Sequence, residues 1–211
     1  GTFANFQPSS LTNINGSLYF RAFTFETGYE VWKSDGTTTG TNVFKDLVPG
    51  GGTSQPTQLL NANGTLFYTA TDGQKGTELW RHDVTTNTAT QDDIFRGTVN
   101  SNARDFTNVN GTIFFVADNG TNGSELWKSA ANGTGAAMVK DIYPGPNGSE
   151  ISGLVNLNGT LYFSARNDTN GVELWKSDGT AAGTVLFKDI SPGNGSSYPS
   201  SLTNANGTLI F

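Results

Sequence analysis

Short apolar runs alternate with polar, glycine-rich turns along the whole chain, and no run is long and periodic enough to predict a helix. The pattern is clearest in the stretch 152–199, where the apolar runs occupy residues 154–157, 160–165, 172–177 and 184–190. Asn158-Gly159 separates the first two runs and supplies two residues that tolerate positive φ, the signal for a two-residue type I′ hairpin. The sequence therefore predicts four antiparallel strands in this stretch.

The same pattern recurs at a nearly constant period. An Asn-Gly-Ser/Thr phrase occurs five times, 47 or 48 residues apart, with its glycine at Gly16, Gly64, Gly111, Gly159 and Gly207. The four tryptophans keep step with it at Trp32, Trp80, Trp127 and Trp175. Periods of this length are typical of repeat proteins in which each unit buries its apolar face against its neighbours.

The second strand of each unit indicates how the units pack. Its residues are apolar at consecutive positions, as in 66–68, 113–115 and 161–163, so both of its faces require burial. Radial stacking of small sheets buries both faces. We therefore predict an all-β fold, a β-propeller built from four-stranded antiparallel blades of about 48 residues. Residues 1–211 are expected to form one repeat domain, with units at 8–55, 56–103, 104–151 and 152–198 and a partial fifth unit at 199–211.

The third strand and the turn after it resemble a known repeat. Residues 173–180 read Glu-Leu-Trp-Lys-Ser-Asp-Gly-Thr, and residues 30–37 differ from them only by Val31 for Leu. This is similar to the ELWxxDGT repeat of large bacterial secreted and surface proteins. The second copy keeps Glu78-Leu79-Trp80 and the third Glu125-Leu126-Trp127, but both lose the Asp-Gly-Thr. The resemblance implies propeller-like blades and an extracellular or cell-surface location, and it implies no general activity.

Composition narrows the range of partners and cofactors. A net charge of −6 and a pI near 4.6 argue against nucleic acid and anionic membranes, because both need a surplus of Lys and Arg. No apolar stretch is long enough to span a bilayer. The absence of Cys excludes a disulfide framework, so stability is expected to come from packing between blades. The chain begins at Gly1 without Met, which fits removal of a leader.

The partial fifth unit leaves an apolar end at 209–211, where other copies continue into a third strand. We expect first that the chain is a piece of a longer repeat array. Alternatives are that the last hairpin overlaps the first blade, or that it donates its strands to another molecule in a head-to-tail assembly.

Catalysis has little support in the sequence. His82-Asp83 could be drawn into a Ser-His-Asp arrangement, but a turn residue in a drifted repeat explains it better. One Glu per repeat before each Leu/Val-Trp is what a structural role produces. We therefore predict no enzyme activity and no cofactor other than calcium.

Two ligand hypotheses remain. The four tryptophans named above could stack on sugar rings, although filling the packing between blades is the preferred interpretation. The turn before the repeated Glu carries oxygen ligands of the kind that Ca²⁺ binds, and the candidates are Asp118, Asn122, Glu125, Asp168, Asn170 and Glu173. Ordinary turn chemistry is the competing explanation.

The sequence therefore supports two functional classes. The first is a non-enzymatic structural or adhesive module whose partners are other copies or surface proteins, and the alternative is a lectin-like propeller that binds carbohydrate. A unique pocket would require positions at which the four copies carry different residues. Two sets of equivalent positions, which we call the variable columns, differ in this way: Arg21, Thr69, Val116 and Ser164, and Phe23, Thr71, Asp118 and Arg166. Sequons outside the hairpins make Asn119, Asn132, Asn147 and Asn194 glycosylation candidates.

Overall fold

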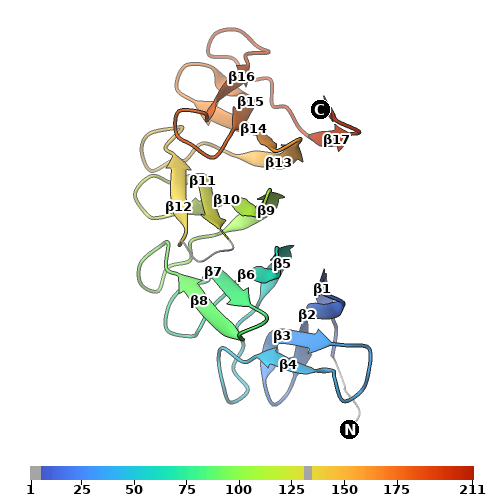
Figure 1. Cartoon of the computed structure of the whole chain (residues 1–211). Coiled ribbons are helices and arrows are strands. Elements are labelled where there is room, and N and C mark those ends of the chain that lie inside the picture. The colour runs from blue at the N-terminus through green and yellow to red at the C-terminus, as the bar shows by residue number, and fades with distance from the viewer. Residues whose placement is uncertain (1–5, 131–134) are drawn as a thin grey trace. The chain divides into compact units, whose positions relative to one another are not determined.

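The computed structural model of the chain describes residues 6–130 and 135–211 (Figure 1). The regular structure of these residues is β, which confirms the predicted all-β class. It forms four antiparallel sheets of four strands each and one two-stranded hairpin. The strands are β1 (Ser9–Ile14), β2 (Ser17–Thr24), β3 (Gly28–Ser34), β4 (Asn42–Lys45), β5 (Thr57–Ala62), β6 (Thr65–Ala70), β7 (Glu78–Asp83), β8 (Thr88–Asp92), β9 (Arg104–Val109), β10 (Thr112–Asp118), β11 (Ser124–Ala130), β12 (Ala137–Lys140), β13 (Ser152–Leu157), β14 (Thr160–Asn167), β15 (Gly171–Ser177), β16 (Val185–Lys188), β17 (Thr203–Ala205) and β18 (Thr208–Ile210).

The chain divides into two compact units, Gly1–Ser101 and Asn102–Phe211, and the single repeat domain stays a prediction. The first unit holds the sheets β1–β4 and β5–β8, and the second holds β9–β12, β13–β16 and the hairpin β17–β18. Within each sheet the strands pair in chain order, so each sheet is a simple meander. The sheets are blades of the propeller type. Among the described residues, no helix is long and apolar enough to cross a membrane.

The Asn-Gly turns have the predicted geometry. Asn158 has φ 52° and Gly159 has φ 86°, and the flanking residues Leu157 and Thr160 face each other in the register of β13 and β14. The Asn-Gly turns of the other four copies have nearly the same pair of φ values. Two consecutive left-handed residues define the type I′ turn, whose twist matches that of the flanking strands. The hairpin between the first two strands is therefore set locally by two residues.

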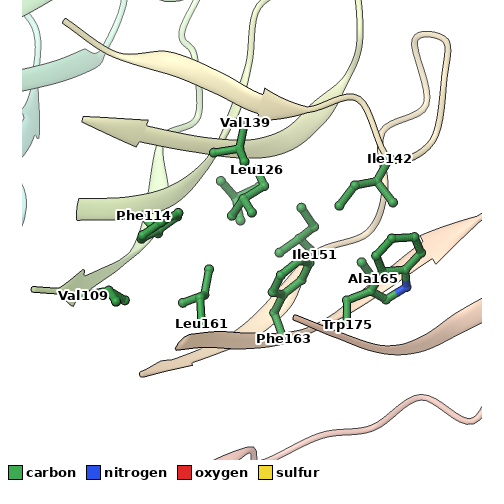
Figure 2. Close-up of a cluster of buried hydrophobic side chains, with 11 residues drawn as sticks. Val109, Phe114, Leu126, Val139, Ile142, Ile151, Leu161, Phe163, Ala165 and Trp175 are labelled. Carbon is green, nitrogen blue, oxygen red and sulfur yellow. The ribbon is translucent and has the colours of Figure 1, made fainter. Parts of the chain in front are cut away.

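The second strand of each sheet is buried on both faces, as its unbroken apolar run predicts. Leu66, Phe67 and Tyr68 of β6 are fully buried, and so are Ile113 and Phe115 of β10. One face of β6, with Leu66 and Tyr68, packs against Ile14, Tyr19 and Phe44 of the neighbouring sheet in the same unit. In the second unit, Leu126 and Val139 of the third sheet pack with Phe163 and Trp175 of the fourth (Figure 2).

Candidate functional site

The repeated glutamate is the most deeply buried acidic group of each sheet. Glu30, Glu78, Glu125 and Glu173 begin the Glu-Leu/Val-Trp phrase of the third strands, and each side chain is fully shielded from solvent. A buried carboxylate is costly unless it accepts hydrogen bonds. The structure supplies these from the segment that leaves the fourth strand and leads to the next sheet.

Glu30 shows the arrangement. Its Oε2 accepts the N–H of Leu47 at 3.1 Å and the hydroxyl of Ser54 at 2.6 Å, and its Oε1 accepts the N–H of Ser54 at 2.8 Å. The carbonyl of Ser54 in turn accepts the N–H of Thr71, in the following sheet, at 3.0 Å. One carboxylate and one serine thus connect two consecutive sheets, and we call this pair the carboxylate joint.

The carboxylate contacts of the joint recur in each four-stranded sheet, and the link through the serine carbonyl recurs at Ser149, which accepts the N–H of Arg166 at 2.7 Å. Glu78 accepts backbone N–H groups of Ile94 and Ser101, both at 3.0 Å. Glu173 accepts the N–H groups of Ile190, Ser191 and Ser197 and the hydroxyl of Ser197, at 2.7–3.3 Å. These contacts occupy both oxygens of each carboxylate, which agrees with the structural role expected for one Glu per repeat.

Glu125 makes the same kind of contacts, and its pKa is raised above the ordinary value of a glutamate. Burial raises the pKa of Glu125 to about 7, against the opposing effect of hydrogen bonds from the N–H of Ile142, the hydroxyl of Ser149 and the N–H of Tyr143. The nearby Asp141 adds to the increase. Burial is also the largest cause of the raised pKa of Glu30 and of Glu78.

The shift predicts a pH-dependent stability. Because the folded state holds the proton of Glu125 more tightly than an unfolded chain with a pKa near 4.5, this contribution is complete below about pH 4.5 and is lost as the pH rises through 7. A shift of this size corresponds to about 3 kcal/mol at most. We expect the unfolding free energy of the Glu125→Gln variant to vary less between pH 5 and 8 than that of the parent, measured by urea denaturation. Parallel curves for the two proteins would contradict the assignment.

The calcium candidates do not converge on one cage of oxygens. Both polar atoms of the Asn122 amide are engaged, because it accepts from Asn119 at 3.0 Å and donates to Asp141 at 2.6 Å. Asn170 likewise donates to Asp189 at 2.9 Å. Of the other candidates, Glu125 and Glu173 face the donors of their joints, Asp118 accepts the N–H of Gly120 at 2.7 Å, and Asp168 is exposed. In the part of the chain that the structure describes, no three His, Cys, Asp or Glu side chains gather to hold a metal ion. Calcium binding stays a prediction.

The four tryptophans lie in the packing of the sheets. Their side chains retain only 5–8% of their accessible surface. The indole N–H of Trp80 donates to the carbonyl of Ala70 at 3.0 Å, whereas the indole nitrogens of Trp32, Trp127 and Trp175 are shielded without a hydrogen-bond partner in the described structure. No tryptophan presents an open face on which a sugar ring could stack.

The Ser-Asp-Gly-Thr turn is a self-contained cap on the third strand. Asp178 Oδ1 accepts both the N–H and the hydroxyl of Thr180 at 2.8 Å, and Ser177 bonds Thr184 at 2.7 Å. A Cβ on Gly183, four residues after the glycine of this turn, would lie 2.1 Å from the Asp178 carboxylate, which favours glycine there. The turn at Asp35 repeats these bonds.

In the second sheet a different pair replaces this cap. His82 is fully buried, and its Nε2 lies 2.8 Å from Oδ1 of Asn87 while its ring packs on Phe44 with centroids 4.3 Å apart. The side chain of Asp83 caps the turn by accepting the N–H groups of Thr85 and Thr86. Asp83 thus has the turn role expected from the sequence, whereas His82 is not a turn residue: it lies fully buried within β7, where it pairs with Leu66 of β6.

One repeated interaction was missed by the sequence analysis. An asparagine three residues before each turn glycine accepts the N–H of that glycine, as Asn156 does from Gly159 at 3.0 Å. Its side-chain amide donates to the carbonyl of the equivalent asparagine one copy earlier, from Asn61 to Asn13 and from Asn156 to Asn108, both at 3.0 Å. Asn204 of the hairpin donates to Asn156 in the same way at 3.1 Å. We call this the asparagine step. An Asn-x-x-Gly spacing was the available signal.

The variable columns differ in how much of each side chain is accessible. Thr69, Val116 and Ser164 are buried, but the equivalent Arg21 is not. In the other column, Arg166 forms an ion pair with Glu150 at 2.8 Å. The residue after each joint serine, which is Gln55, Glu150 or Tyr198 in three of the copies, has φ near +50°. This left-handed backbone places a different side chain at the same point of each copy.

The glycosylation candidates have different environments. Asn147 and Asn194 are exposed. Asn119 is half-buried and its amide is committed to Asn122. Asn132 lies outside the described residues.

Comparison with known proteins agrees with the fold class. No protein-family model and no curated protein sequence matches the chain. Among solved structures, the chain is similar to puromycin hydrolase, with a TM-score of 0.55 at 17% identity over 90% of this chain and 30% of that one. It is also similar to a prolyl endopeptidase, with a TM-score of 0.50 at 14% identity over 82% of this chain and 24% of that one. The chain thus spans less than a third of these proteins, and at such identity the likeness shows the β-propeller fold alone.

Proposed function

We propose that this chain is a non-enzymatic repeat module of an extracellular or cell-surface protein, of the kind that the ELWxxDGT pattern resembles. Its role is structural or adhesive, and it associates head to tail with further copies of the same repeat. The repeated acidic groups support the non-enzymatic part, because the joints occupy both oxygens of each carboxylate.

The observation that carries the proposal is an uncovered blade face. Phe44 and Val139 in the fourth strands of the first and third sheets are 9% and 6% exposed, because the next sheet of the same unit packs on them. The equivalent Phe187 is 49% exposed, and Ile190 nearby is 40% exposed. A further repeat would bury this face as the others are buried.

The hairpin β17–β18, which lies next to β13 of the same unit, supports the same partner. β18 pairs with β17 along one edge, and its other edge pairs with no strand in the described chain. In the complete sheets, the equivalent strand pairs along that edge with the strand that carries the tryptophan. A tryptophan-bearing strand from another copy could pair with the free edge of β18. The rest of that copy's sheet could then cover the apolar face around Phe187.

The expected result is concentration-dependent association of the 22.3 kDa chain into an open series of oligomers, measured by sedimentation velocity from about 1 to 300 µM. Phe187→Ser should reduce the association at least tenfold. Val99→Ser is the matched control, because Val99 is similarly exposed, at 51%, in the first unit. A monomer over the whole range, or a closed dimer, would overturn the head-to-tail proposal.

A further inference from the structure

Arg21 stands out among the cations of the first unit. It lies in the middle of β2, in a column where the other three copies carry small buried side chains. Its guanidinium forms no ion pair with a described residue, and the five residues before Phe6 contain no Asp or Glu. Arg21 is therefore a cation without a counter-ion.

The guanidinium is nevertheless held in place. Its carbon lies 3.8 Å from the centroid of the Tyr29 ring, so that the cation stacks on the aromatic face. Nη2 donates to Oε1 of Gln55 at 2.8 Å. Nε is shielded from solvent and has no hydrogen-bond partner. A fixed, planar guanidinium recognises a carboxylate, and because Nε is shielded, the two Nη atoms must supply the hydrogen bonds to it.

Two amides lie close to this cation and its tyrosine, and a row of aromatic rings continues beyond the tyrosine, with the Phe23 centroid 5.0 Å from that of Tyr29. Gln7 and Gln55 occupy equivalent positions in consecutive copies, each just before a proline. Both have left-handed backbone, with φ 36° and 49°. The Tyr29 hydroxyl donates to Gln7 at 3.4 Å. Phe23 packs edge-on against Phe25, which is 72% exposed. Primary amides can donate to and accept from hydroxyl groups, and an exposed ring offers a flat apolar surface.

The second unit provides the contrast. Its arginine Arg166 stands two residues further along the strand, at the position equivalent to Phe23, and its guanidinium carbon lies 5.5 Å from the centroid of the Tyr143 ring. Its guanidinium is neutralised by Glu150 at 2.8 Å. Both arginines therefore lie beside a tyrosine ring. They differ because Glu150 pairs with Arg166, whereas no carboxylate of a described residue pairs with Arg21.

We propose that Arg21, with Tyr29, Gln7, Gln55 and Phe25, binds an acidic saccharide through the carboxylate of a uronic acid residue. The carboxylate completes the hydrogen bonding of the guanidinium, the two amides contact ring hydroxyls, and Phe25 lies against a ring face. All five residues belong to the first unit, so the site is separate from the blade face around Phe187 and does not depend on the proposed assembly.

The test is a titration of the full chain with oligogalacturonate and with a neutral galactose oligomer of the same length, followed by calorimetry. We expect saturable binding of the acidic oligomer, at least tenfold weaker binding of the neutral one, and a loss of affinity with added salt. Arg21→Gln should weaken oligogalacturonate binding tenfold or more, whereas Arg166→Gln should leave it within twofold.

Two further variants keep the test decisive. Phe25→Ser changes an exposed side chain and should weaken binding without altering the circular dichroism spectrum, even if Arg21→Gln does not fold. Phe187→Ser should bind like the parent, which separates this site from the assembly. No binding of oligogalacturonate at millimolar concentration, equal binding of the neutral oligomer, or equal losses in the Arg21 and Arg166 variants would overturn the proposal.

Discussion

Replacement of Glu30 by Ala is expected to lower the unfolding free energy by about 3–5 kcal/mol. The substitution leaves the N–H of Leu47 without its acceptor and the hydroxyl of Ser54 with only the carbonyl of Tyr29, at 3.4 Å, and each such loss costs about 1–3 kcal/mol. It also removes the shorter of the two contacts of the Ser54 N–H, which retains the carbonyl of Tyr29 at 3.1 Å.

Equilibrium urea denaturation at pH 8 measures the loss, and hydrogen exchange locates it, because the amides of Leu47 and Ser54 should lose protection first. The control is Glu150→Ala, which removes an exposed ion pair and should cost less than about 1 kcal/mol. Equal losses in the two variants would show that the buried carboxylate does not hold the joint.

Gly28→Ala is expected to destabilise the first unit by more than about 3 kcal/mol. Gly28 has φ +65°, and a Cβ there would lie 1.9 Å from the carbonyl oxygen of Gly52 in the segment that leads to the next sheet. That segment would have to move away, and with it the hydroxyl of Thr53 that accepts the Tyr29 N–H at 3.0 Å.

Gly36→Ala is the matched control for this substitution. Gly36 has φ +90° in a turn of the same sheet, but a Cβ there meets no atom within 4 Å. It therefore isolates the cost of a left-handed alanine, about 1 kcal/mol. Thermal or urea unfolding of both variants gives the comparison, and a difference below about 1 kcal/mol would show that the close approach at Gly28 is relieved easily.

The sequence predicts those parts of the fold that are set locally. The Asn-Gly turns dictate their own backbone, and consecutive apolar residues such as Leu66, Phe67 and Tyr68 can only lie in a strand covered on both sides. The strand order then follows from four short segments joined by tight turns.

The interactions between sheets could not be predicted in the same way. Glu30 finds its donors 17 and 24 residues later, in a segment whose path depends on the packing of two sheets. The asparagine step joins residues 48 positions apart through a backbone carbonyl, which carries no sequence signature. For the calcium candidates the same limit applies, since the hydrogen bond from Asn122 to Asp141 joins residues 19 positions apart that the local pattern does not connect.

The asparagine step also bears on how such chains can change in evolution. Within each unit, the asparagine of the later copy donates its side-chain amide to the backbone carbonyl of the asparagine in the earlier copy. A copy between two others, such as that of Asn156, therefore uses its amide toward one neighbour and its carbonyl toward the other. Duplication or loss of one whole period by unequal recombination reproduces the same donor and acceptor at the new junction. An insertion of part of a period does not, because it separates the amide from its carbonyl. A change in copy number by whole periods would therefore preserve this contact and the direction in which it runs along the array.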